Sequence, residues 1–81
     1  MARVVVRYFA AARAAAGVAE DVVDADTVSG CLLTIQARHG PELARVLRVC
    51  TLLVDGLAVK DVNRPLGDAI EIDVLPPFAG G

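Results

Sequence analysis

Clusters of β-branched and aromatic residues alternate along this chain with alanine-rich or helically spaced apolar residues, and each change of pattern predicts a new element. Residues 3–9 are β-branched and aromatic after Arg3, which predicts a strand. Residues 10–16 are almost entirely alanine and predict a two-turn helix, which Gly17 can end as a C-cap. Residues 18–23 resume a β-type pattern, so we expect a second strand paired with the first.

The longest helical repeat follows Thr27, whose hydroxyl can cap a helix that begins at Val28. Apolar residues then recur every three or four positions, which predicts one apolar face. A Gly-Pro pair at 40–41 ends this helix, and residues 41–49 predict another short helical piece. The apolar face of the main helix is expected to contain Val28, Cys31, Leu32, Leu33, Ile35 and His39.

The rest of the chain predicts three more strands. Residues 50–54 are apolar, and the Asp55-Gly56 pair after them suits a type I′ turn, which requires positive φ at both central positions. Residues 57–59 would return as the second strand of this hairpin. Residues 69–75 alternate clearly, and two prolines then end that strand because proline lacks the N–H that a ladder needs. This last strand is expected to turn Ile70, Ile72 and Val74 to one face and Glu71 and Asp73 to the other.

These elements predict an α+β fold in a single domain, since 81 residues are too few for two. One main helix, short extra helical turns and a mixed sheet of four or five strands form two layers. This order of elements is the β-grasp, or ubiquitin-like, arrangement. We expect residues 1–77 to form the β-grasp domain and residues 78–81 to form a flexible C-terminal tail.

Composition narrows the classes of partner. The formal net charge is −2, there is no run of Lys or Arg, and the aromatic residues are Tyr8, Phe9 and Phe78, so we expect no nucleic-acid partner. No apolar run approaches the roughly 20 residues that span a bilayer, and no signal-peptide pattern opens the chain. We therefore expect a cytoplasmic protein with no membrane partner. Cys31 and Cys50 lack metal-type spacing, so we expect two buried thiols and no metal site.

The C-terminus carries the candidate chemistry. After Pro76-Pro77 only Phe78, Ala79, Gly80 and Gly81 remain, and four extended residues reach about 13–14 Å. Two glycines allow the end of the chain to enter a narrow channel. The Gly81 carboxylate is a poor electrophile until ATP-dependent adenylation supplies a leaving group. Attack by sulfur on the adenylate would then give a thiocarboxylate, whereas attack by a lysine amine would give protein conjugation.

Several segments resemble the MoaD/ThiS family of ubiquitin-like sulfur carriers, over the whole length of the chain. The C-terminal block, Leu75-Pro76-Pro77 with Gly80-Gly81, is the most specific of them. At the hairpin, the family often has Asn where this chain has Asp55. The other similar segments are Val6 to Ala10 with Arg13 and Gly17, Thr27-Val28, Leu53 to Gly56, and Pro65-Leu66 with Asp68 and Glu71.

Within this family, a Pro-Pro pair before a short Gly-Gly tail is most similar to the small, sulfur-carrying subunit of molybdopterin synthase. The resemblance implies that an E1-like adenylating enzyme (MoeB-type) uses ATP to adenylate Gly81 and that a sulfurtransferase converts the adenylate to a thiocarboxylate. It also implies that the tail enters a MoaE-type large subunit, in a heterotetramer, and donates sulfur to cyclic pyranopterin monophosphate. We expect no bound cofactor and no catalysis by the chain alone.

The tail residues have expected roles in this scheme. Phe78, Ala79 and Gly80 would insert into the partner, and Phe78, Pro77 and Pro76 would contact it, with Phe78 as a hydrophobic anchor. Arg3, Arg7, Arg45 and Arg48 are interpreted as solvated side chains, some of which would meet an acidic partner.

Three alternatives remain open from the residues. The chain could carry sulfur for thiamine thiazole or cysteine synthesis, or it could be a ubiquitin-like protein modifier. A stand-alone enzyme would need a pair such as Cys50 and His39, but no third group is available to orient the base.

Overall fold

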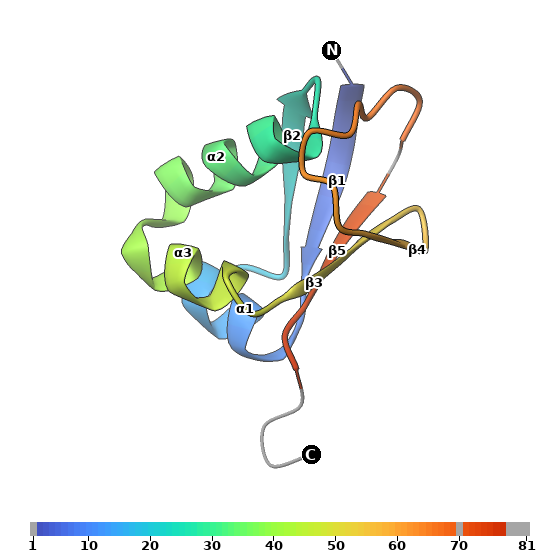
Figure 1. The fold of residues 1–81 in the computed structure, drawn as a ribbon. Helices are drawn as coiled ribbons and strands as arrows, with labels where there is room; N and C mark the ends of the chain where they lie inside the picture. The colour runs from blue at the N-terminus through green and yellow to red at the C-terminus, as the bar shows by residue number, and fades with distance from the viewer. Residues whose placement is uncertain (1, 70, 78–81) are drawn as a thin grey trace.

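The computed structural model describes residues 2–69 and 71–77, which fold into a five-stranded mixed sheet with helices on one side (Figure 1). The strand order is β2-β1-β5-β3-β4, with β1 parallel to β5 and the other neighbours antiparallel. The elements are β1 (Ala2–Tyr8), α1 (Ala10–Ala16), β2 (Glu20–Ala25), α2 (Val28–His39), α3 (Pro41–Leu47), β3 (Thr51–Val54), β4 (Leu57–Val59) and β5 (Glu71–Leu75). The predicted α+β β-grasp fold is confirmed.

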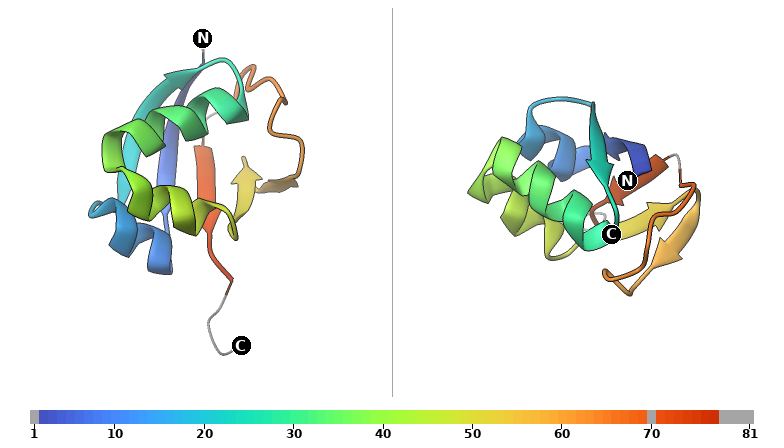
Figure 2. Two further views of the ribbon diagram at one scale, coloured as in Figure 1. Left: turned by 60° about the vertical axis from the view of Figure 1, so that its left-hand side comes forward. Right: turned by 90° about the horizontal axis from the view of Figure 1, so that it is seen from above.

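The helices form one layer and the sheet forms the other, as the two views of Figure 2 show. Helix α2 packs mainly over β2, and α1 packs over β1 and β5. The opposite face of the sheet has no helix over it in the described part of the chain. None of the described helices is long and apolar enough to span a membrane.

Strand alternation builds the core, as the sequence predicts. Alternate residues of β1 and β5 turn inward and are buried, and α2 and α3 supply the other half. Burial of each such side chain contributes roughly 1.5–3 kcal/mol relative to exposure. The fully buried members are Val4, Val6, Ala12, Val23, Val28, Cys31, Ile35, Leu43, Ile72 and Val74.

Local signals fix several of the element ends. Gly17 ends α1 with φ 76°, and its N–H donates to the Arg13 carbonyl at 2.9 Å. The Thr27 hydroxyl accepts from the Gly30 N–H at 3.0 Å and caps α2. Asp55 and Gly56 have φ of 47° and 86°, as a type I′ turn requires. These three predictions are confirmed.

Four details differ from the prediction. Leu33 is 65% exposed, because it lies about 140° around the helix from Val28 at 3.6 residues per turn. Strand β2 starts at Glu20 rather than residue 18, since the chain is still turning after the left-handed Gly17. Strand β3 starts one residue late because the Cys50 N–H still donates to the Leu47 carbonyl of the preceding turn. Cys50 is half-buried rather than buried.

Two predictions fall partly outside the described residues. The alternation of β5 is confirmed from Glu71 onward, but Ile70 is not among the described residues. The division of the chain after residue 77 stays a prediction, because residues 78–81 also lie outside them.

A polar cluster at the C-terminal end of α2 joins that helix to β1 and β2. The Asp21 carboxylate accepts from the Tyr8 hydroxyl at 2.7 Å and lies 2.6 Å from His39 Nε2. The Tyr8 and His39 rings pack edge to face, and the side chains of Asp21 and His39 are only 16% and 14% exposed. His39 is therefore part of a cross-link between two layers.

We expect Asp21→Asn to lower the free energy of unfolding by about 1–3 kcal/mol, because it weakens hydrogen bonds to a carboxylate shielded from water. Urea unfolding at neutral pH checks this. Asp24 lies in the same strand as Asp21 and forms an exposed ion pair with Arg3 of β1. Asp24→Asn removes that ion pair, should change stability much less, and serves as the control. Equal effects of the two variants would contradict the cross-link.

The same cluster predicts a pH dependence. Burial alone would raise the pKa of Asp21, but the hydrogen bonds from Tyr8 and His39 outweigh it and hold that pKa below its ordinary value of 3.8. A depressed carboxyl pKa stabilises the fold above the unfolded pKa, and this stability is lost as the pH falls through the folded value. The stability gap between wild type and Asp21→Asn should therefore shrink below about pH 4. A gap that stays constant in acid would contradict this assignment.

Candidate functional site

The origin of the C-terminal tail lies at the end of the central strand of the sheet. Strand β5 pairs with β1 on one side and β3 on the other, and Leu75 is opposite Thr51. The Val74 carbonyl also accepts from the Phe9 N–H at 3.2 Å. The last residues of the strand are therefore held from both sides.

The two prolines end β5 where the sequence predicts. The strand stops at Leu75, Pro76 is half-buried and Pro77 is exposed. Proline cannot donate to a ladder, so neither neighbouring strand can continue its pairing through these residues. The other predicted site residues, Phe78, Ala79, Gly80 and Gly81, lie outside the described residues, and their roles stay predictions.

A charged cluster lies on the open face of the sheet, beside β5. Arg7 Nη1 is 3.1 Å from Glu71 Oε1, and Arg7 Nε is 3.5 Å from Asp73 Oδ1. Burial, and then the neighbouring Glu71, raise the pKa of Asp73 above its ordinary range. Asp73 Oδ1 is buried and accepts no hydrogen bond from any described residue. Among these residues, the 3.5 Å ion pair with Arg7 is the contact that offsets the cost of burying its charge.

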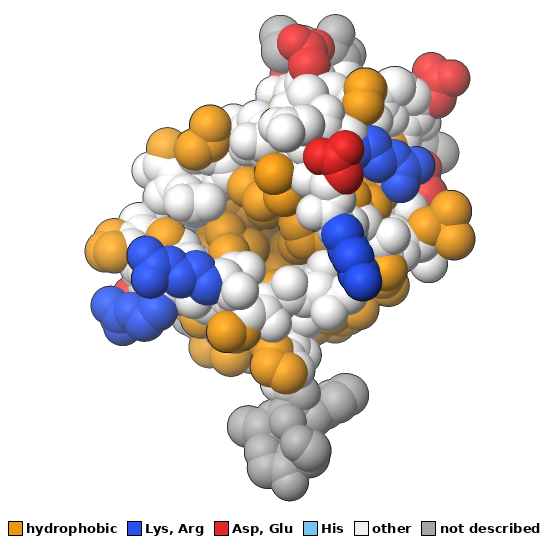
Figure 3. Space-filling model, viewed as in Figure 1, with side chains coloured by type: hydrophobic (Ala, Val, Ile, Leu, Met, Phe, Trp, Pro, Cys, Tyr) orange, Lys and Arg blue, Asp and Glu red, His pale blue; other side chains and the backbone are white. Residues whose placement is uncertain are grey.

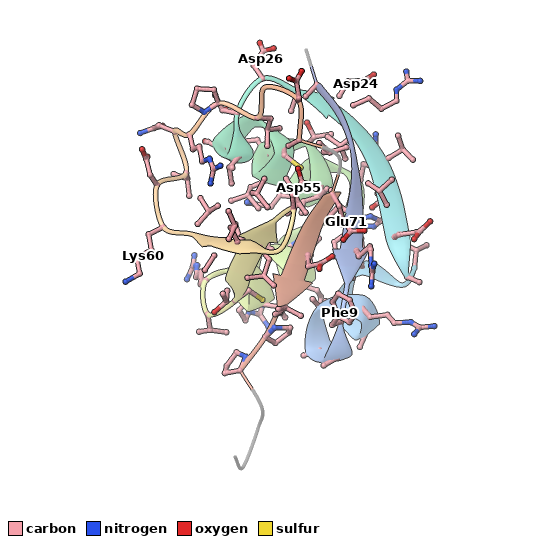
Figure 4. The ribbon with its side chains drawn as sticks, turned by 90° about the vertical axis from the view of Figure 1, so that its right-hand side faces the viewer. Phe9, Asp24, Asp26, Asp55, Lys60 and Glu71 are labelled. Atoms are coloured by element: carbon pink, nitrogen blue, oxygen red, sulfur yellow. The ribbon has the colours of Figure 1, made fainter. Side chains whose placement is uncertain are left out.

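Phe9 continues this face toward the origin of the tail. It follows β1 directly, is half-buried, and has the Arg7 guanidinium 5.3 Å from its ring centroid. This distance suits a cation–π contact. Figure 4 shows Phe9 at the end of the sheet from which the tail leaves, with Glu71 farther up the same face. Phe9 therefore lies on the surface beside the end of β5.

Asp55 fixes the opposite end of β5. Its side chain accepts from the Glu71 N–H at 2.9 Å, and its own N–H donates to the Glu71 carbonyl at 3.0 Å (Figure 4). The β3–β4 turn thus holds the first residue of β5. An asparagine, which the family often has here, offers the same acceptor and tolerates the same positive φ.

Sequence reasoning missed the Arg7 cluster and treated Arg7 as a solvated side chain. The alternation in β1 and β5 does place Arg7, Glu71 and Asp73 on outward faces. Nothing in the sequence shows that β1 and β5 are neighbours with Arg7 opposite Asp73, so the contact could not be predicted.

The described residues also test the predictions about metal binding and about a Cys50–His39 pair. No group of three or more His, Cys, Asp or Glu residues there could hold a metal ion. Cys50 donates to the Val46 carbonyl at 3.2 Å, and burial raises its thiol pKa, while His39 binds Asp21. Asp21 is therefore an orienting group for His39 that the sequence did not reveal, but the hydrogen bond of Cys50 goes to Val46 and not to His39.

We expect Asp55→Ala to destabilise the protein by about 1–2 kcal/mol, because alanine at φ 47° is strained and lacks the acceptor for Glu71. Urea unfolding measures the loss, and amide hydrogen exchange should show faster exchange at Glu71. Asp55→Asn is the matched control and should stay close to wild type. If the alanine variant left exchange at Glu71 unchanged, the turn would not hold β5.

Comparisons with known proteins extend these observations. Residues 6–81 match the ThiS family. The solution structure of small archaeal modifier protein 1 from Methanosarcina acetivorans is similar, with a TM-score of 0.85 and 28% identity over 100% of this chain and 98% of that one. The crystal structure of the protein of the same name from Haloferax volcanii gives 0.75 and 28%, over 98% and 99% of the two chains.

A further similar structure is a chain in the complex of subunits 1 and 2 of the molybdopterin-converting factor from Helicobacter pylori 26695. It has a TM-score of 0.75 and 25% identity, over 98% of this chain and 99% of that one. No curated protein matches the sequence. The family match covers nearly the whole chain and extends through Gly80-Gly81. The chain therefore belongs to the ThiS family.

Proposed function

We propose that the chain is the sulfur carrier of a molybdopterin synthase, with the cargo held at Gly81. The observation that carries this proposal is the end of β5. The central strand stops at two prolines, which are followed by four residues that end in Gly-Gly. The match of this chain to the ThiS family runs through its last residue. A strand that is paired on both sides, followed by a short segment whose last two residues have no side chain, suits delivery of a terminal carbonyl into a partner.

The chemistry follows from the carboxylate. An E1-like adenylating enzyme joins the Gly81 carboxylate to the α-phosphate of ATP and releases pyrophosphate. The persulfide of a sulfurtransferase then attacks the carbonyl carbon, AMP leaves, and the resulting acyl disulfide is reduced by a thiol, which forms a disulfide with the sulfurtransferase cysteine and leaves a thiocarboxylate at Gly81. The sulfur is next donated to cyclic pyranopterin monophosphate as part of a dithiolene, and the carboxylate is regenerated for another cycle. The carrier's own side chains hold and present the terminus but perform none of these steps.

The proposed recipient is a MoaE-type large subunit in a heterotetramer. The Helicobacter pylori neighbour, a complex of subunits 1 and 2 of a molybdopterin-converting factor, supports a partner of this kind. The open sheet face is suitable for the contact, because Phe9 and the Arg7 cluster lie along the strands that lead to the tail. Phe78, Pro77 and Pro76 would continue that contact into the large subunit.

A second candidate function is protein modification. Two similar structures, both 28% identical to this chain, are called small archaeal modifier protein 1. Adenylation would be common to both functions, but a lysine amine would replace sulfur as the nucleophile and leave an isopeptide bond. The β-grasp body and the terminal glycines suit either outcome, so the product must distinguish them.

We expect the intact mass of protein from cells that make its activating enzymes to show replacement of one C-terminal oxygen by sulfur. Deleting Gly81 should abolish this loading and leave the circular dichroism spectrum unchanged, because β5 ends before the tail. A Gly81-deleted protein that is still loaded would contradict the proposal. Covalent adducts that survive reducing gels, without any sulfur-loaded form, would favour the modifier function.

We expect Phe78→Ala to weaken binding to the purified large subunit by more than about 1 kcal/mol, the usual threshold for a contributing interface residue. Calorimetric titration measures the affinity. Arg13→Ala changes an exposed residue of α1 and is the control, for which little change is expected. Unchanged affinity for the Phe78 variant would exclude the anchoring role.

A further inference from the structure

An apolar groove opens on the helical side of the molecule, on the other side of the sheet from the Arg7 cluster, and its edge at Thr51 lies beside Leu75 at the end of β5. Its volume is about 360 Å³. It lies where the helical layer stops, since α2 packs over β2 and α1 over β1 and β5. We call it the β4 groove; it is lined by Leu32, Leu47, Cys50, Thr51, Leu52, Ala58, Val59, Lys60 and Val62.

The β4 groove is a continuation of the hydrophobic core that no described element covers. Leu52 is nearly buried at 8% exposure, whereas Val62 is 41% exposed. Leu32, Leu47 and Val59 are half-buried and pack against the core. Figure 3 shows the result as a hydrophobic hollow in the middle of this face. A contiguous apolar hollow with polar edges is typical of a site for a partner.

The charges around the groove indicate the kind of partner. Three of the chain's eight Lys and Arg residues, namely Arg3, Arg7 and Arg38, form ion pairs with carboxylates. The cations next to the groove form no ion pair with any residue that the structure describes. Of these groove cations, Lys60 lines the groove, and Arg45, Arg48 and Arg64 lie one or two positions along the sequence from the lining residues Leu47 and Val62.

Figure 3 shows Lys and Arg side chains on both sides of the hollow. Figure 4 shows Lys60 extending outward from the segment that follows β4. One carboxylate of the same segment, Asp61, accepts from the Asn63 N–H at 3.0 Å and keeps its negative charge. Figure 3 also shows a carboxylate close to the hollow, so this face combines an apolar floor with rims on which cations outnumber carboxylates.

We propose that the β4 groove binds a peptide segment of a partner protein that carries apolar side chains flanked by carboxylates. The apolar side chains would cover Leu52 and Val62, and the carboxylates would pair with Lys60 and the cations of α3. Such complementarity contributes to specificity and to the rate of association more than to affinity.

A second copy of this chain fits the groove less well. A two-fold contact places the same patch of each copy against the other, so the rims around Lys60 and Arg48 would face identical cations. Nucleic acid is also a poor occupant, because no aromatic side chain lines the groove to stack on a base. The groove lies on the opposite face of the sheet from Phe9 and Arg7, so an occupied groove leaves these two side chains accessible.

The test uses the full chain labelled with nitrogen-15 and two synthetic peptides. The first has four Val, Ile or Leu residues flanked on each side by Asp and Glu, and the second has Lys in place of each acidic residue. We expect the acidic peptide to shift amide signals of the groove-lining residues. Lys60→Glu should weaken its binding about fivefold or more, and Val62→Asp should do the same.

Two variants serve as matched controls. Arg13→Glu reverses an exposed cation away from the groove, and Leu33→Asp changes a 65% exposed residue of α2 that does not line it. Both should bind the acidic peptide as wild type does. Raising the salt from about 0.05 M to 0.5 M should weaken binding to wild type more than to Lys60→Glu.

Several results would overturn the proposal. They are an absence of shifts at millimolar acidic peptide, equal binding of the lysine peptide, and equal affinity of Lys60→Glu and Arg13→Glu. A concentration-dependent dimer that Val62→Asp abolishes would assign the groove to a second copy instead. If deleting residues 78–81 shifts the groove amides in the absence of peptide, the groove holds the protein's own tail. None of these results bears on sulfur loading, so the proposed function is tested separately.

Discussion

Strand β5 is the constraint on which the rest of the molecule depends. It lies in the interior of the sheet, parallel to β1 and antiparallel to β3, so its backbone groups have partners on both sides. Asp55 holds its first residue and the Phe9 N–H holds Val74 near its end. Because Pro76 follows directly, the paired region ends at a defined residue. The last four residues can extend at most about 13–14 Å beyond Pro77.

Strand β1 divides the polar chemistry between the two sides of the sheet. Arg7 and Tyr8 are neighbours in sequence, so their side chains leave opposite faces. Tyr8 points into the helical side and binds Asp21, whereas Arg7 lies on the open side and pairs with Glu71 and Asp73. The first cluster joins layers and stabilises the body. The second gives the open face, next to the origin of the tail, a defined arrangement of charge.

Local patterns predicted most of the fold, and long-range contacts account for what they missed. Thr27, Gly17 and Asp55-Gly56 act through neighbours in sequence, so the chain alone shows their roles. The Arg7–Glu71 pair joins residues 64 positions apart and depends on the parallel register of β1 and β5. The contact between His39 and Asp21 likewise depends on tertiary packing, in this case of α2 against β2, and sequence reasoning did not connect these residues. At the candidate site, the end of β5 at Pro76-Pro77 was predictable, because proline ends a strand through its own backbone.

The features that make this chain suitable as a carrier do not by themselves select a cargo. Adenylation requires a carboxylate and an accessible terminus, and both a thiocarboxylate and an isopeptide bond begin from that adenylate. The choice of nucleophile belongs to whichever enzyme holds the adenylate when it reacts. Recognition of the body by that enzyme can make the selection, and this chain has two different surfaces for it. One is the charged open face beside β5, and the other is the apolar, cation-rimmed β4 groove. Because they lie on opposite sides of the sheet, a partner that binds one of them does not cover the other.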